Sequence, residues 1–463
     1  MGRLHRELQA KVTMTIQWCG VSKNTTKAIL TKGLLLCLIG FQATLQAEEL
    51  SLVRAQQLAI AQDPNLKGNG YREEAIRHEE QAAGYWSNPQ LSASLQNLPT
   101  DGFSLDQEPM TQFKVGVKQQ LPRGDVNHLT QQRLAVMASK VGTESEARKA
   151  WVKKEVSALW LDWYYASQRL QLLDKEKHLL NQLLDVTESR YAQALGGAQQ
   201  GDVLQVRLAI LTLEDKQTQA IQAQHEAKAA LSQWLGAPLT GVVAPERFEQ
   251  HSLLTEYKLD TSTFFQLIGE SEPFTLLQQH PEAQLLQLQT QVEQKQLAIA
   301  REQTKSQWSV EASYGYRQDA QNGASRADFV SLGVQVDLPF FTKPKQDASI
   351  SAAASKVNAL KTDFRLKVNA LAAQADVLKA RYVSLNERKA LYQNGLVEEV
   401  AELAQTLLTS YTTDTANFSE VINANIRQIQ VEDELLRIQM SEAKTLSSLL
   451  YLYLPAWQAA SNT

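Results

Sequence analysis

The sequence predicts a mostly α-helical protein built from two tandem repeats, each with a pair of β-strands and one very long helix. Pro64 and Pro122 recur 217 positions later as Pro281 and Pro339, so both copies keep the same internal spacing. In each copy a polar helical run precedes two segments of alternating apolar and polar residues, and a long proline-free stretch follows them. Equal spacing and equal periodicity indicate a duplication rather than a chance match.

The N-terminal residues 1–47 have the features of a secretory signal peptide. Gly33–Phe41 is a continuous apolar run of nine residues, which is far shorter than the ~20 residues of a membrane-spanning helix. Lys27 and Lys32 precede this run, and Ala43–Ala47 follows it with the small residue Ala47 at the expected cut. We therefore expect cleavage after Ala47 and export of the remaining chain.

Removal of this segment changes both the cysteine content and the charge. Cys19 and Cys37 lie within it, so the mature chain has no cysteine and forms no disulfide. The mature chain carries 40 basic and 49 acidic side chains, a net charge of −9. This acidic balance argues against nucleic acid as a partner.

Four segments with period 2 predict strands at about 89–97, 110–121, 308–316 and 329–338. One face of each strand is apolar and the other is polar, which also fits a soluble sheet that covers a core. Strand length and the adjoining long helices favour a transmembrane β-barrel. Four strands cannot close a barrel, so such a barrel requires an oligomer. The side chains expected to face lipid are Leu91, Leu95, Phe113, Val115, Val117, Trp308, Val310, Tyr314, Tyr316, Val330, Leu332, Val334 and Val336.

Each strand pair leads into a long helix, predicted at Arg123–Ala194 and Lys345–Ser410. Apolar residues in both helices step by about three and four positions, which is typical of a coiled-coil seam. The first seam comprises Val152, Val156, Leu159, Trp163, Ala166, Leu170 and Leu173. The second comprises Leu360, Phe364, Val368, Leu371, Ala375, Leu378, Tyr382 and Leu385. Helices of this length are expected in a tube wall or a coiled coil.

Both long helices end in a turn from which a shorter helix returns, at Asp202–Leu235 and Glu420–Tyr453. Asp202 and Glu420 stand at the starts of the return helices, where a carboxylate also serves as a cap for the exposed N–H groups. The breaks Gly236–Pro238, Gly241 and Pro245 predict a separate small feature between the two copies.

This order of elements resembles the TolC family of outer-membrane efflux proteins over essentially the whole mature chain. The residues that carry the resemblance are Asn88-Pro89, Leu121-Pro122, Leu338-Pro339, and the turns from Tyr191 to Leu204 and from Tyr411 to Ile422. The resemblance implies a signal peptide at 1–47, a first repeat at 48–237, an inter-repeat equatorial segment at 238–273, a second repeat at 274–455 and a C-terminal tail at 456–463.

The resemblance also implies a homotrimer, in which twelve strands close one barrel in the outer membrane and long helices form a periplasmic tunnel. The expected partners are outer-membrane lipid, a periplasmic adaptor protein, and an inner-membrane pump of the RND type or an ABC transporter. Family members close the tunnel at the hairpin tips with inward acidic side chains. The corresponding candidates here are Tyr191, Gly197, Asp202, Tyr411, Asp414, Asn417 and Glu420.

Two departures affect this comparison of the tips. Asn423 stands where the family commonly has a second acidic residue, so a ring at this site would carry less charge. The first turn has two extra residues between Tyr191 and Asp202, which leaves its geometry open. The residues around Gly197 and Gln199, and Glu108–Gln112, look somewhat like the heavy-metal-efflux branch.

No residue pattern in the sequence indicates catalysis. The seven histidines are scattered without a metal-ligand pairing, and Ser441-Glu-Ala-Lys444 lacks the companion motifs of the enzymes that use such a motif. We expect no enzyme activity, no metal site and no cofactor. The predicted function is an exit duct for passive export from a Gram-negative cell, with heavy-metal cations as one candidate substrate. A duct for type I protein secretion, or a periplasmic coiled-coil adaptor or structural protein, is the alternative.

Overall fold

The structure is a computed structural model that describes residues 48–193, 199–248, 252–255, 257, 259–270, 273–413 and 417–461. The expected signal peptide, with both cysteines, lies outside these residues. The chain divides into two units. Among the described residues, the smaller unit is a two-stranded parallel sheet of β1 (Glu48–Glu49) and β4 (Val242–Val243). The larger unit holds all other elements and is described below.

The first repeat consists of four helices and two strands. Its helices are α3 (Leu52–Gln62), α4 (Pro64–Ala83), α5 (Val126–Ala192) and α6 (Gln200–Leu235). A break at Asp63-Pro64 separates α3 from α4, because proline has no N–H to continue a helix and is favoured at the first position of a new one. Asp63 caps α4 by accepting from the backbone N–H of Asn65, and its buried carboxylate also accepts from Arg148 on α5 at 2.6 Å.

The second repeat has the same order of elements. Its helices are α10 (Pro281–Glu302), α11 (Lys343–Leu391), α12 (Val397–Thr412) and α13 (Phe418–Ser461), with the short η1 (Phe340–Thr342) before α11. Pro281 again occupies the first turn of a helix, and His280 takes the capping place that Asp63 has in the first repeat. The inter-repeat segment contributes α7 (Ser252–Thr255), α8 (Thr261–Glu270) and α9 (Pro273–Gln278).

All four predicted strands are present, so the predicted fold class of long helices with a pair of β-hairpins is confirmed. The strands β2 (Gln90–Gln96), β3 (Gln112–Gln120), β5 (Gln307–Tyr316) and β6 (Phe329–Asp337) form one antiparallel sheet in the order β2-β3-β5-β6. The bounds of β6 lie 217 positions after those of β3, which is the offset seen in the sequence. The two hairpins differ in register, however. In the first hairpin Leu91 pairs with Val117, so the offset of 217 would pair Trp308 with Val334. In the second hairpin Trp308 pairs instead with Val336, two positions further along β6.

Two helices differ from their predicted bounds. The second long helix is interrupted by a π-helical turn, η2 (Tyr392–Leu396), between α11 and α12. A π turn holds one extra residue, and Gly395 within it has open space around its Cα. At the C-terminus, α13 continues to Ser461, beyond the predicted end at Tyr453 and into the expected tail.

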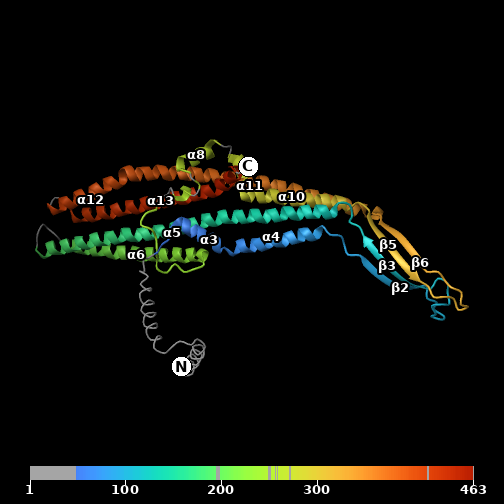
Figure 1. The fold of residues 1–463 in the computed structure, drawn as a ribbon. Coiled ribbons are helices and arrows are strands. Elements are labelled where there is room, and N and C mark those ends of the chain that lie inside the picture. The colour runs from blue at the N-terminus through green and yellow to red at the C-terminus, as the bar shows by residue number, and fades with distance from the viewer. Residues whose placement is uncertain are drawn as a thin grey trace, which may run out of the picture. The chain divides into compact units, whose positions relative to one another are not determined.

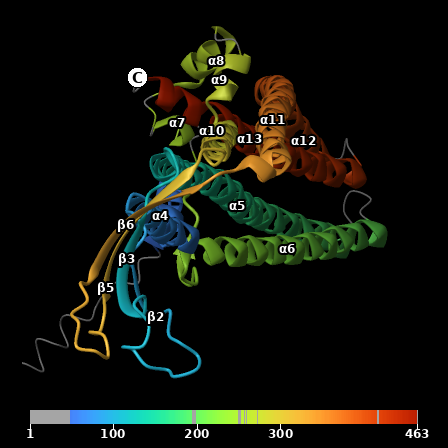
Figure 2. The same ribbon diagram turned by 90° about the vertical axis from the view of Figure 1, so that its right-hand side faces the viewer.

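The helix α5 packs against α6 and α4 and, separately, against α10 and α13, while α11 and α12 pack against α13 (Figures 1 and 2). Most of the predicted seam residues are buried, among them Val152, Trp163 and Leu173 on α5 and Val368 and Leu385 on α11. Among the helices described, none combines the length and the apolar character that membrane spanning requires.

Candidate functional site

The apolar face of the sheet has no covering layer from the described residues of the chain. Leu332 is 83% exposed, and Phe113 and Trp308 are each 49% exposed. Of the side chains predicted to face lipid, Val336 is half-buried and the other twelve are exposed. A sheet of a soluble protein would bury these residues against its own core.

On the central strands β3 and β5 the polar face of the sheet is the more enclosed one, whereas the outer strands β2 and β6 are exposed on both faces. Ser309 and Ser313 on β5 are buried, although Val310 and Tyr314 beside them are exposed. A Cβ on Gly116 would lie 3.1 Å from Ser92 Oγ and 3.2 Å from Ser313 Cβ, so the side chains on this face are crowded. Lys114 and Glu311 form an ion pair at 3.8 Å on the same face. On these two strands burial is therefore reversed relative to polarity, as in a barrel with a wet interior and a lipid-facing exterior.

Both outer strands of this sheet are paired on one side only. Within the described residues β2 pairs with β3 alone, and β6 pairs with β5 alone. An unpaired strand edge presents a row of free N–H and C=O groups, which natural proteins usually cover or pair. The sheet is thus incomplete at both edges.

The tips of the two helical hairpins are held together by an apolar cluster. Its buried members are Leu183, Val206, Tyr411, Phe418, Val421 and Ile422. The rings of Tyr411 and Phe418 lie 5.3 Å apart, between the end of α12 and the start of α13. Tyr411 is therefore mainly a packing residue here, and its buried hydroxyl has no hydrogen-bond partner among the described residues.

Polar contacts also link the first hairpin to the second at the tips. Arg190 on α5 donates to the backbone oxygen of Tyr411 at 2.9 Å, and its guanidinium lies 4.5 Å from the centre of the Tyr411 ring. Ser419 on α13 donates to Gln205 on α6 at 2.9 Å. These contacts are the kind of link that a conformational change at the tip would have to break.

The two acidic residues predicted at the tip have different surroundings. Asp202 accepts from the backbone N–H of Gln199 at 2.9 Å and so caps α6, in agreement with the capping alternative. Glu420 is exposed in the first turn of α13, and its carboxylate has no partner in the described part of the chain. Tyr191 and Asn417 are also exposed. Gly197 and Asp414 lie outside the described residues.

Sequence reasoning missed two polar residues on α5 that continue its apolar spacing toward the tip. Glu176 and Arg190 follow the same steps of three and four as Leu173, Leu180 and Leu183. Glu176 is 5% exposed in the seam with α6, and its Oε2 has no hydrogen-bond partner among the described residues. A charged residue at a seam position was the signal that could have identified both.

Burial raises the pKa of Glu176 to about 7, and Lys216 on α6 opposes this rise only in part. The folded protein therefore binds this proton more tightly than the unfolded chain, whose carboxyl has an ordinary pKa of 4.5. The contribution of Glu176 to the free energy of unfolding therefore falls as the pH rises from about 4.5 to about 7. Above that range this contribution is constant. The charged form of Glu176 is the destabilising one.

Replacing Glu176 by glutamine should raise the melting temperature more at pH 8 than at pH 5. We expect a gain of about 2 kcal/mol at pH 8, less than the full pKa difference would give because nearby solvent screens the charge. This gain in stability is measured by thermal unfolding of the solubilised protein, with circular dichroism as the signal. Glu214→Gln, at an exposed site on α6, is the control. Equal pH profiles for wild type and Glu176→Gln would contradict the assignment.

A cluster of aromatic side chains on α5 packs between elements. Trp160 stacks on Tyr164 at 5.5 Å and contacts the ring of Phe248 at 5.4 Å. Trp160 also donates to the backbone oxygen of Leu50 at 2.8 Å. These contacts fix the inter-repeat segment and the start of the first repeat against α5.

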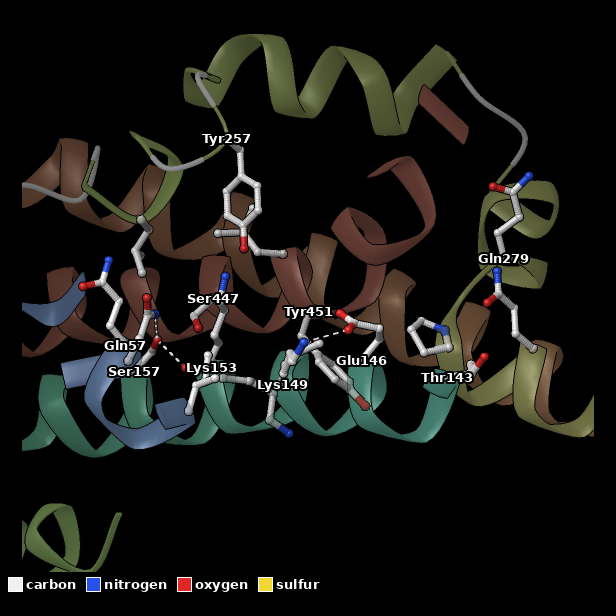
Figure 3. Close-up of a pocket in the computed structure, with 18 of the residues that line it drawn as sticks. Gln57, Thr143, Glu146, Lys149, Lys153, Ser157, Tyr257, Gln279, Ser447 and Tyr451 are labelled. Carbon is white, nitrogen blue, oxygen red and sulfur yellow. Dashed lines mark hydrogen bonds and ion pairs between the residues drawn. The ribbon is translucent and has the colours of Figure 1, made fainter. Parts of the chain in front are cut away.

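A cavity of about 830 Å³ lies between α3, α5, α10, α13 and the inter-repeat segment (Figure 3). Tyr257 projects toward it from the side of that segment, α5 runs along the opposite side, and Ser447 and Tyr451 of α13 lie between them. Of its lysines, Lys149 is paired with Glu146, and Lys154 is paired with Glu155 beside the cavity. We interpret this cavity as the polar space beneath the inter-repeat segment rather than as a site of chemistry. In the described ranges no three His, Asp or Glu side chains converge as a metal site would require.

Exposed apolar stripes run along the two outer flanks of the helical region. On α6 the stripe consists of Leu204, Leu208 and Leu211, which are between 57% and 65% exposed. On α11 the exposed side chains of Leu366, Ala370, Ala373, Val377 and Ala380 follow steps of four and three, and Leu391 continues the stripe. Each stripe lies opposite the buried seam of its own helix, as a second packing surface would.

No protein-family model and no curated protein sequence matches this chain. Solved structures do match it. A membrane protein from Pseudomonas aeruginosa superposes with a TM-score of 0.70 at 16% identity, over 88% of this chain and 92% of that one. The outer membrane protein VceC from Vibrio cholerae gives 0.66 at 15% identity, over 87% and 95%. CusC, described in connection with transmembrane channel formation, gives 0.69 at 13% identity, over 88% and 92%.

The chain has the fold of the TolC family of outer-membrane efflux proteins. In this TolC-family fold the two candidate regions lie at opposite ends of α5. The strands adjoin its start near Val126, and the hairpin tips adjoin its end near Ala192, which at 1.5 Å per residue is ~100 Å away. The TolC-family fold thus separates the apolar sheet from the charged tips by the length of the helical region.

Proposed function

We propose that this protein is the outer-membrane exit duct of a tripartite efflux system. The observation that carries the proposal is the burial pattern of the sheet, whose aromatic and aliphatic face is exposed on all four strands while its polar face is enclosed on the central strands β3 and β5. A periplasmic adaptor, the competing function, would be soluble and would need these apolar side chains inside its own core. In this structure these apolar side chains are exposed.

The duct would be a homotrimer. Four strands with two free edges cannot close a barrel, whereas three copies supply twelve strands and pair every edge. The apolar stripes on α6 and α11 form two flanks of the helical region, and these flanks meet when copies pack side by side. Oligomerisation would bury both kinds of incomplete surface at once.

The tips of the helical hairpins would be the periplasmic gate. Arg190 and Tyr411, and Gln205 and Ser419, link the hairpins of one chain, so opening requires these contacts to rearrange. A periplasmic adaptor, together with a pump of the RND type or an ABC transporter, would bring this about. The substrate is chosen by the pump, and heavy-metal cations are one class to be tested.

Cell fractionation and planar bilayers test the proposed duct. We expect heat-modifiable trimers in the outer-membrane fraction of a Gram-negative host, and stepwise conductance when the purified protein is added to a bilayer. Release of the protein with the soluble periplasm, or a folded monomer in detergent-free buffer, would overturn the proposal.

Replacing Glu420 by alanine should shift the ion selectivity of the channel away from cations and toward anions. In the trimer three exposed carboxylates at the tip would attract cations and repel one another when the tips crowd together. The measurement is the reversal potential in a KCl gradient, together with block by divalent cations. Glu246→Ala removes the same charge in the inter-repeat segment and serves as the control. Unchanged selectivity and unchanged block would remove Glu420 from the gate.

A further inference from the structure

A cleft of about 280 Å³ between α11 and α13 is lined by three arginines. Arg381 and Arg388 come from α11 and Arg437 from α13, and the hydroxyls of Ser384 and Ser441 complete the polar lining. Guanidinium and hydroxyl groups are hydrogen-bond donors, and guanidinium in particular matches the geometry of carboxylates and phosphates. The cleft is thus built mainly from donors.

The arginines of this cleft outnumber the acidic groups that neutralise them. Glu434 alone accepts from both Arg388 and Arg437, at 2.7 Å and 2.6 Å. The hydrogen bond from Arg437 lowers the pKa of Glu434, so this carboxylate stays ionised. Arg381 is exposed and has no partner among the described residues. The cleft therefore carries three positive charges against one negative charge.

Two acidic residues near the cleft, Asp433 and Asp162, are already paired with other cations. On α13, Asp433 already accepts from Tyr165 at 3.0 Å and is paired with Arg169 at 3.3 Å. Asp162 on α5 is paired with Lys444 of α13. Both of these acidic groups are matched by a cation, so neither of them offsets the surplus of positive charge in the cleft.

The position of Arg381 and Arg388 on α11 determines which way they face. Tyr382 lies against Phe265 of α8 at 4.5 Å, and Lys389 is paired with Glu442 of α13 at 2.6 Å. At 3.6 residues per turn, Arg381 and Arg388 project about 110° from Tyr382, between the α13 side and the exposed apolar stripe. Arg381 and Arg388 therefore project from the side of α11 that is turned away from α8. Figure 2 shows α8 beside α10 and α11.

In the proposed trimer this side of α11 faces the tunnel. The apolar stripe of α11 is the flank toward the next copy, and α10 and α13 cover the other flank. The helices α7, α8 and α9 have to lie outside, since three copies of them would fill a tunnel walled by the long helices. The remaining direction, in which Arg381 and Arg388 point, is the lumen.

We propose that the arginine cleft of Arg381, Arg388 and Arg437 is an anion-binding site on the tunnel wall, so that the duct favours exported molecules bearing carboxylate, sulfonate or phosphate groups. This inference rests on the proposed function. Three clefts in a trimer would form a positive belt above the acidic tips. Such a belt lowers the energy of an anion in the tunnel and raises that of a cation.

Ion selectivity in planar bilayers tests the positive belt, because removing a positive charge and removing a negative charge should shift the selectivity in opposite directions. Arg381→Gln should shift the reversal potential in a KCl gradient toward cation preference and weaken the block by tripolyphosphate. Glu434→Gln should shift the reversal potential toward anion preference and strengthen the block by tripolyphosphate. A damaged fold would not produce this opposite change. Arg365→Gln, an equal charge change on another, exposed side of α11, should leave both unchanged.

The outcomes separate this inference from the function on which it rests. Absence of any channel from the wild-type protein overturns the exit duct. A normal channel whose selectivity and block do not respond to Arg381→Gln or Glu434→Gln overturns the anion site alone. An equal response to Arg365→Gln would also overturn it, because the effect would then be one of net charge.

Discussion

Replacing Leu332 by arginine should prevent the protein from assembling in the outer membrane. Leu332 lies in the middle of β6, opposite Ala312 of β5, and is 83% exposed on the apolar face of the sheet. On the lipid face of a transmembrane barrel, arginine near the bilayer midplane costs about 2–4 kcal/mol. A trimer would meet this cost in each of its three copies, which is large beside the net stability of most proteins.

The neighbouring residue provides a matched control for this prediction. Ser331 is adjacent in β6 and points to the polar face, because successive side chains of a strand alternate. Ser331→Arg should therefore assemble normally, although it adds the same charge. The measurement is the amount of heat-modifiable trimer in the outer-membrane fraction. Assembly of Leu332→Arg at the wild-type level would show that this face does not contact lipid.

The sequence predicted the strands closely because their side-chain period and the paired prolines act locally. Both signals define where a strand begins and ends, and the bounds of β3 and β6 agree with the offset of 217 residues. The register between strands is a different property. It depends on the loops, and the loop from Asn97 to Thr111 is longer than that from Arg317 to Asp328. The shift of two positions between the hairpins could not be read from strand periodicity.

The interruption of the second long helix could not be predicted for a related reason. A π turn adds one residue without proline, and Gly395 alone is a weak helix breaker. The C-terminal end of α13 lies beyond the predicted end at Tyr453, since α13 continues past Pro455 although proline commonly ends a helix. Both errors concern helix continuity, where tertiary packing overrides local preference.

The candidate gate was only partly accessible from the sequence. The resemblance identified Tyr411 and Glu420, and the structure gives Tyr411 a packing partner in Phe418 and leaves Glu420 exposed. The contact of Arg190 with Tyr411 joins residues 221 positions apart, so no local pattern predicts it. The roles of these residues in gating remain proposals that the selectivity measurements test.

Replacing Leu208 by glutamate should separate the proposed trimer into monomers. Leu208 is 65% exposed on α6, on the side opposite the buried Leu213 that packs against α5. If the stripe of Leu204, Leu208 and Leu211 is the contact with the next copy, burying Leu208 stabilises each interface by about 1.5–3 kcal/mol. Glutamate loses this contribution and places a carboxylate between apolar side chains, which adds a cost for desolvation.

The effect should appear in assembly and leave the fold of each chain intact, since Leu208 makes no part of the buried seam. We expect the solubilised Leu208→Glu protein to elute as a monomer in size-exclusion chromatography with light scattering, with unchanged helical circular dichroism. Ile221 is also an exposed apolar residue of α6, but at 3.6 residues per turn it projects about 140° from Leu208 and so lies outside the stripe. Ile221→Glu makes the same kind of change and should remain trimeric. If Leu208→Glu also remained trimeric, this flank of α6 would face solvent, and the contact between copies would have to lie elsewhere.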